Sequence, residues 1–208
     1  MIVPFLLFSA LLFFSVIFDI LLLIIVILYG DKKRIPVVYI YNLLICNAID
    51  NIILFIGYYM PMIWEDDFYL EFRRVTGPVL TIFCTFFYEH SLYLNPLMIV
   101  QRIYGVYDPT SNLFSDKKLW IYSAILAIVS LISLLIPFFS ECQINMNQRL
   151  LTFESACAPN RHTITTLQNR YLFLIPVFSM LLNIALILFL SIKHGELLHN
   201  LDNTHTSE

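Results

Sequence analysis

Long apolar stretches constrain the fold of this 208-residue chain more than any other feature of its sequence. A helix needs roughly 20 apolar residues to cross about 30 Å of hydrocarbon. Five stretches reach that length, at about residues 2–29, 36–61, 77–104, 119–139 and 171–192. Each must be helical in a bilayer, because exposed backbone groups find no hydrogen-bond partner there. The sequence therefore predicts an all-α, polytopic membrane helix bundle with five transmembrane helices.

The composition agrees with a lipid environment. Only 13% of the residues are charged and 59% are hydrophobic, whereas about 25% of a soluble domain is charged. We expect residues 1–193 to form one transmembrane bundle in the lipid bilayer and residues 194–208 to form a polar cytoplasmic tail. The formal net charge of −3 provides no basic surface for nucleic acid. We therefore expect an integral membrane protein that does not bind nucleic acid.

The basic residues predict the orientation of the bundle. Lys32, Lys33 and Arg34 are packed into the very short loop after the first apolar stretch, and short loops rich in Lys and Arg remain on the cytoplasmic side. The N-terminus should thus lie outside and the C-terminus inside. The first stretch has neither the basic start nor the cleavage site of a signal peptide, so we interpret it as a retained span.

Two of the four cysteines lie in one predicted external loop. Cys142 and Cys157 fall between the fourth and fifth spans, where the environment is oxidising. The sequence permits either a disulfide that closes this loop into a cover or two separate thiols. Cys46 and Cys84 lie within spans and are interpreted as small packing residues.

Polar residues recur along one face of the third span. Their spacing of three or four residues is that of a helical stripe, which comprises Cys84, Tyr88, Ser91, Asn95, Met98 or Ile99, and Arg102. Lipid disfavours such a stripe, so we expect it to face the bundle.

An ionisable side chain at bilayer depth costs about 2.5–3.5 kcal/mol and normally faces protein or water. Asp50 is expected to form an intramembrane polar cluster with Ser91 and Asn95, either for a function or simply as hydrogen bonds between helices. Glu89 either forms hydrogen bonds to neighbouring helices or lines a ligand cavity together with Cys84 and Tyr88.

No catalytic or metal-binding pattern supports enzyme activity. The chain has no H-x-x-x-H, H-E-x-x-H, G-x-S-x-G, C-x-x-C or Walker motif, each of which places reactive groups in a defined geometry. We expect no enzyme activity, no metal site and no cofactor.

The segment "QRIYGVYDP", Gln101–Pro109, resembles the end of the third helix of G-protein-coupled receptors. In those receptors an acidic residue, an arginine and an aromatic residue precede a proline. Asp50 resembles the acidic residue of their second helix, and Pro176 resembles their fifth-helix proline. More narrowly, "IPVVYIYNLL", "GPVLTIFCTFFYEHSLYLNPLMIVQRIYGVYDPTS" and "CAPNRHTITTLQNRYLFLIP" are similar to nematode serpentine chemoreceptors, most of all class xa.

This resemblance implies a function for the inner end of the third helix. Arg102, with Gln101, Tyr104 and Pro109, would form the switch that meets a heterotrimeric G protein, while a small external ligand binds at the outer side. Without the resemblance, the better explanation of Arg102 is a cation that anchors the helix end at the membrane surface. Gln101 replaces the acidic neighbour, which weakens the internal partner of Arg102 to a hydrogen bond.

The resemblance also implies a seven-helix fold, of which the chain matches the first five helices. It thereby predicts a truncated chemosensory receptor in the plasma membrane, with the sensory cilium as one destination and retention in the endoplasmic reticulum as a consequence of truncation. Coupling to a G protein would need completion to seven helices, and a receptor oligomer is a second expected partner. Two alternatives remain: a five-span channel or transporter subunit with Asp19, Asp50 and Glu89 along an ion path, and a non-signalling fragment that acts through full-length receptors.

Overall fold

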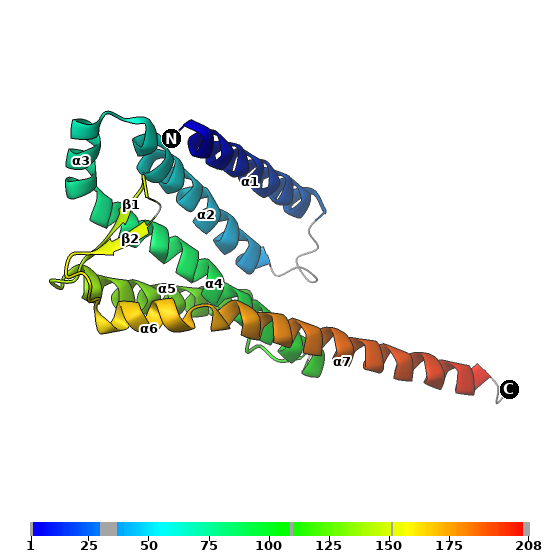
Figure 1. The fold of residues 1–208 in the computed structure, drawn as a ribbon. Coiled ribbons are helices and arrows are strands. Elements are labelled where there is room, and N and C mark those ends of the chain that lie inside the picture. Colours follow the sequence, from blue (N-terminus) through cyan, green and yellow to red (C-terminus); the bar gives the residue numbers. More distant parts are fainter. Residues whose placement is uncertain (1, 30–36, 109, 151, 206–208) are drawn as a thin grey trace.

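The computed structural model describes residues 2–29, 37–108, 110–150 and 152–205 of a chain built mainly from long helices (Figure 1). The five longest are α1 (Ile2–Tyr29), α2 (Val37–Ile53), α4 (Gly77–Tyr107), α5 (Asp116–Phe138) and α7 (Leu174–His205). α2 continues into the π-helical turn η1 (Leu54–Tyr59) and the 3-10 turn η2 (Met60–Ile63). Two short helices, α3 (Asp66–Val75) and α6 (Thr163–Tyr171), and an antiparallel hairpin of β1 (Ile144–Asn147) and β2 (Thr152–Ser155) complete the described elements. The predicted all-α polytopic helix bundle is confirmed.

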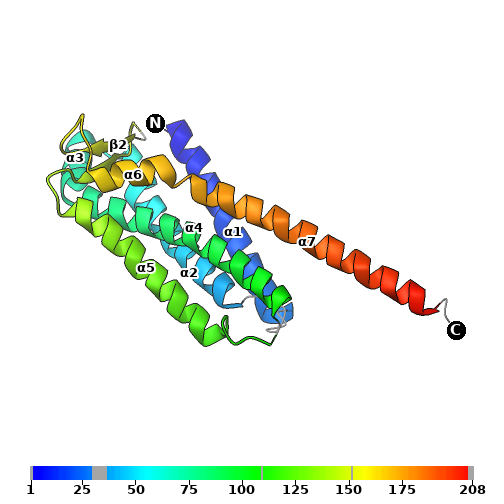
Figure 2. The ribbon, with the colours of Figure 1, turned by 90° about the horizontal axis from the view of Figure 1, so that it is seen from below.

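Lower apolarity, rather than length, separates α4 from the other long helices. Among the described residues, four helical segments are long and apolar enough to cross a membrane: Val3–Leu28, Val37–Ile63, Asp116–Phe138 and Thr163–Ile192. α4 has 31 residues and is long enough, but polar and ionisable residues such as Glu89, His90 and Arg102 make it less apolar. It lies in the middle of the bundle and packs against α2, α5 and α7 (Figures 1 and 2). A central helix exposes little of its surface to lipid and can therefore carry polar residues.

The two ends of the bundle differ in structure. The N-terminus, α3 and the β-hairpin lie at one end, and the connection between α4 and α5 lies at the other (Figure 1). This arrangement follows from helices that run alternately in opposite directions, as the prediction of successive spans requires. The basic loop residues Lys32, Lys33 and Arg34 lie outside the described residues.

The segment predicted as the fifth span, residues 171–192, lies mostly in α7 and is preceded by the separate short helix α6. α6 ends at Tyr171, a turn covers residues 172–173, and α7 begins at Leu174. Pro176 lies in the first turn of α7, where the missing N–H of proline leaves no hydrogen bond unmade. Residues 194–205, predicted as part of a polar tail, continue α7 as helix.

Candidate ligand-binding site

A cavity of about 330 Å³ lies among α4, α5, α6 and the β-hairpin. Ligand sites in proteins commonly have volumes of about 300–1,000 Å³, so a small molecule fits this space. Its polar and aromatic lining comes from Thr81, Cys84, Thr85, Tyr88 and Glu89 on α4, Phe138 on α5, Phe153 on β2, and Thr165, Gln168 and Asn169 on α6. The three residues predicted to line a ligand cavity, Cys84, Tyr88 and Glu89, thus lie around the same space.

Glu89 connects three helices at one wall of the cavity. Its side chain is 1% exposed. The Ser130 hydroxyl on α5 donates a hydrogen bond to Oε2 at 3.2 Å, and the Gln168 side-chain amide on α6 donates to the same oxygen at 3.4 Å. Gln168 also donates to the Ser133 hydroxyl oxygen at 3.1 Å. Glu89 therefore combines the two roles that its sequence position leaves open, because it both lines the cavity and joins neighbouring helices.

The predicted stripe of α4 is buried only in part. Ile99 is 0% exposed and Tyr88 is 53% exposed, Ser91 and Asn95 contact α2, and Arg102 is exposed. Glu89, His90 and Leu94, each at most 4% exposed, are buried on other sides of the helix.

Partners on α5 account for the burial of Glu89 and His90. The Ser130 hydroxyl reaches Glu89, and the Ser123 hydroxyl lies 3.5 Å from Nε2 of His90. Ser123 also donates to the side-chain oxygen of Asn42 on α2 at 3.0 Å. Sequence analysis did not single out Ser123, Ser130 or Gln168. The seven-residue spacing of the two serines, which places them on one face of a helix, is the signal that could have identified them.

The predicted cluster of Asp50, Ser91 and Asn95 is not joined by hydrogen bonds among the described residues. The Tyr39 hydroxyl donates to the side-chain oxygen of Asn95, Ser91 lies beside Cys46, and Asp50 lies beside the Cys84 thiol. α2 and α4 are antiparallel (Figure 1), so residues farther along α4 meet earlier residues of α2. Ser91 and Asn95 are therefore one turn or more away from Asp50. The Oδ1 atom of Asp50 is buried without a hydrogen-bond partner among the described residues.

Asp19 has partners on the neighbouring helix. The side-chain amides of Asn47 and Asn51 on α2 donate to its carboxylate at 3.3 and 3.5 Å. Asp19 thus lies between α1 and α2, whereas Glu89 faces α5 and α6. In the part of the chain that the structure describes, these two acidic residues and Asp50 lie at different helix interfaces and do not form the shared ion path that a channel or transporter subunit would need.

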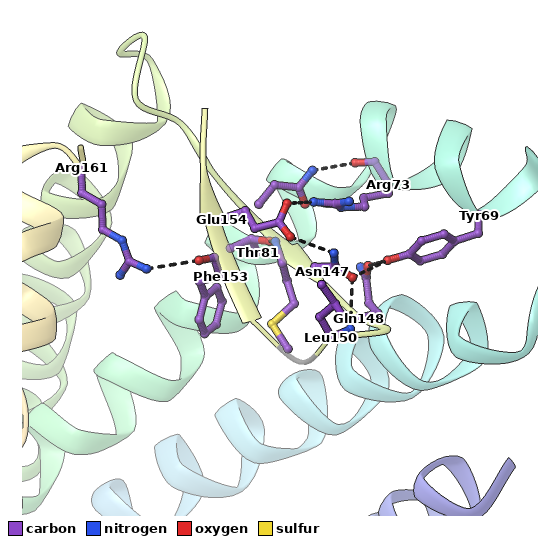
Figure 3. A network of polar contacts seen from close by, with 11 residues as sticks. Tyr69, Arg73, Thr81, Asn147, Gln148, Leu150, Phe153, Glu154 and Arg161 are labelled. Carbon is purple, nitrogen blue, oxygen red and sulfur yellow. Dashed lines mark hydrogen bonds and ion pairs between the residues drawn. The ribbon is translucent and has the colours of Figure 1, made fainter. Parts of the chain in front are cut away.

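Polar contacts hold the β-hairpin over the outer end of α4 (Figure 3). The Asn145 side-chain amide donates to the Arg73 carbonyl at 2.8 Å, and the Met146 backbone N–H donates to the Thr81 hydroxyl oxygen at 3.1 Å. The Tyr69 hydroxyl donates to the side-chain oxygen of Asn147 at 3.1 Å. Because Ile144 and Phe153 of the hairpin line the cavity, these contacts position part of the cavity wall.

An ion pair between Arg73 and Glu154 reinforces the hairpin (Figure 3). Glu154 also accepts a hydrogen bond from the Asn147 side-chain amide at 2.8 Å. The hydrogen bond from Asn147 and the contact with Arg73 lower the pKa of the Glu154 carboxyl from its ordinary value, since both stabilise the charged form.

Cys142 and Cys157 form a disulfide in the structure, with their Cα atoms 4.8 Å apart and a sequence separation of 15. The closed loop contains both strands of the hairpin. A covalent closure of this kind limits how far the hairpin moves from the outer end of α4, and it thereby keeps the cavity covered. Cys46 and Cys84 are free thiols.

The residues of the predicted switch lie in different surroundings at the inner end of α4. Arg102 is exposed. Gln101 lines a space of about 10 Å³ with Asn42 and Ser123, and its Oε1 atom is buried without a hydrogen-bond partner among the described residues. The Tyr104 ring packs against Phe114 with centroids 5.5 Å apart. Pro109 lies outside the described residues.

Comparisons with known proteins find a matching family and a similar protein. Residues 34–184 match the family described as Caenorhabditis serpentine receptor-like protein, class xa. The chain is also 34% identical over 160 residues to Serpentine receptor class XA 10 of Caenorhabditis elegans, an alignment that covers 76% of this chain and 48% of that protein. The chain thus spans about half the length of this curated relative. No solved structure matches it.

Proposed function

Because the chain belongs to the class xa family of Caenorhabditis serpentine receptor-like proteins, we propose that it binds a small external ligand and signals inward as a chemosensory receptor. The family is one of receptors of the G-protein-coupled type rather than of enzymes. The single observation that carries the proposal is the cavity of about 330 Å³ under the β-hairpin. It opens among helices at the end of the bundle that also holds the N-terminus, which is the predicted external side.

α4 supplies a physical connection between this cavity and the inner end of the bundle. The helix is continuous from Gly77 to Tyr107, with Glu89 at the cavity wall and Arg102 at the other end. A ligand shifts a conformational equilibrium when it binds one state more tightly than the other. A ligand that binds more tightly to one position of α4 would therefore change the position of Arg102 at the other end of the helix.

Arg102 suits the inner contact because of its chemistry and its exposure. A guanidinium group remains charged and offers several donors in a fixed plane, and the Arg102 side chain is exposed rather than packed in the bundle. We propose that it binds a heterotrimeric G protein, with Gln101, Tyr104 and Pro109 as supporting residues. The proposed location is the plasma membrane, including that of a sensory cilium, and a receptor oligomer is a further proposed partner.

A comparison of two arginines tests the proposal. In cells that respond to an odorant from a screening panel through this receptor, Arg102→Ala should abolish the second-messenger response while odorant binding changes less than about twofold. Arg74→Ala provides the control, because Arg74 is an exposed arginine at the opposite end of the bundle. It should preserve both binding and response. A full response from the Arg102→Ala receptor would contradict the switch role.

A further inference from the structure

We infer that the cavity under the β-hairpin selects a small organic cation, an amine protonated at neutral pH and attached to an apolar body, by pairing it with Glu89. The inference rests on the proposed function in that it takes this cavity to be the ligand site. It adds the chemical class of the ligand, which the family relationship does not specify.

The charges around the cavity are unbalanced. Glu89 is the one acidic side chain that lines it, and no Lys, Arg or His is among the described lining residues. At 1% exposure, the carboxylate is removed from bulk water, and an isolated buried charge is costly unless an opposite charge or several hydrogen bonds compensate it. The cavity therefore offers a carboxyl group without a protein cation beside it, and a bound cation would favour the ionised form of that group.

The hydrogen bonds of Glu89 leave one oxygen for a ligand. Ser130 and Gln168 both donate to Oε2. Within the described residues, no donor forms a hydrogen bond with Oε1. An ionised carboxylate has about four acceptor positions, so an ammonium group at Oε1 would add a charge-assisted hydrogen bond without displacing either neutral donor.

The rest of the lining suits the body of such a ligand. Three aromatic residues, Tyr88, Phe138 and Phe153, contribute to the wall, and the faces of aromatic rings attract cations. Leu134 and Ile144 add aliphatic surface. The volume of about 330 Å³ lies at the lower end of the range for ligand sites, which favours a small molecule over a peptide.

Two probes of similar shape and different charge test the inference. The purified chain in lipid nanodiscs is titrated at neutral pH with 2-phenylethylamine and with uncharged 2-phenylethanol, and the dissociation constants are measured by calorimetry or saturation-transfer NMR. We expect the amine to bind at least about tenfold more tightly than the alcohol. This comparison uses the unaltered chain and does not depend on how a variant folds.

Two matched variants assign the preference to Glu89. Glu89→Gln retains the size of the side chain and an acceptor for Ser130, and it should lower amine affinity about tenfold while 2-phenylethanol binds as before. Glu71→Gln removes an exposed carboxylate on α3, outside the cavity, and should leave the preference for the amine unchanged.

The outcomes separate this inference from the proposed function. Equal binding of both probes to the unaltered chain would overturn selection by charge and leave the cavity as a ligand site. A preference for the amine that survives Glu89→Gln would equally overturn the inference. Binding of neither probe at millimolar concentration would remove the ligand site itself, on which the proposed function also depends.

Discussion

Glu154 ties the stability of the β-hairpin to pH. Its hydrogen bond from Asn147 and its contact with Arg73 hold the pKa of its carboxyl below the ordinary value of 4.5. A group with a lowered pKa in the folded state stabilises the fold fully above its ordinary pKa, and this stabilisation is lost as the pH falls through the lowered value. We therefore expect hydrogen-exchange protection of the hairpin amides to decrease as the pH falls below about 4.5. Glu154→Gln should show reduced protection already at neutral pH and no further decrease in that window.

The control for this prediction is Glu71→Gln. Glu71 lies 4.0 Å from Arg74, and both side chains are more than 70% exposed, so their attraction contributes little. This variant should retain the pH profile of the unaltered chain. Identical profiles for Glu154→Gln and the unaltered chain would show that Glu154 does not hold the hairpin.

At the level of residues, sequence reasoning identifies the polar groups better than their partners. Cys84, Tyr88 and Glu89 stand out because polar residues are disfavoured in lipid, and the structure places all three around one cavity. Asp50 stands out for the same reason, but its neighbour is Cys84 rather than Ser91 or Asn95. The pairing depends on the register of two antiparallel helices, and no local pattern in a single sequence specifies that register.

At the level of elements, the close contact between α4 and the hairpin depends on a glycine. A Cβ atom added at Gly77 would lie 3.0 Å from both Cγ and Nδ2 of Asn145. Asn145 would have to move and lose its hydrogen bond to the Arg73 carbonyl. We expect Gly77→Ala to weaken docking of the hairpin by about 0.5–1.5 kcal/mol, the usual net contribution of one hydrogen bond. Hydrogen exchange of residues 144–147 and 152–155 measures this effect.

Gly105→Ala is the matched substitution in the same helix. A Cβ atom there meets nothing within 4 Å, and alanine favours a helix over glycine by about 1 kcal/mol. This variant should leave hydrogen exchange of the hairpin amides unchanged and should not lower the stability of α4. Equal hairpin protection in the two variants would contradict the role assigned to Gly77.

The helices follow from the sequence far more directly than the hairpin does. Apolar stretches long enough to span lipid must be helical, and the starts of α1 and α4 coincide with the predicted starts at residues 2 and 77. Polar and apolar residues alternate over residues 143–147 and 151–154, but each run is short and is not by itself a strong strand signal. The strands are stabilised by contacts from Asn145 and Met146 to Arg73 and Thr81, more than 60 residues earlier in the chain. Such tertiary contacts are not visible in local patterns.

At the level of the whole molecule, α4 is the helix whose relation to the membrane most needs a direct test. It is not among the four described segments that are apolar enough to span by composition, yet it runs through the centre of the bundle between α2 and α5 (Figure 1). The sequence predicts a span here because residues 77–104 form an apolar stretch of sufficient length. Its central position explains how a less apolar helix is accommodated, because neighbouring helices rather than lipid surround most of it.

Labelling of introduced cysteines tests both the orientation of the molecule and the crossing by α4. Asp67 on α3 and Thr110 after α4 are exposed and lie at opposite ends of the bundle (Figure 1). Of the natural cysteines, Cys142 and Cys157 are paired, and Cys46 and Cys84 lie within helices. A membrane-impermeant maleimide should label Asp67→Cys in intact cells and Thr110→Cys only after permeabilisation. The reverse pattern would contradict an external N-terminus. Labelling of both positions in intact cells would contradict passage of α4 through the bilayer, because a helix that connects the two sides must place these positions on opposite sides of the membrane.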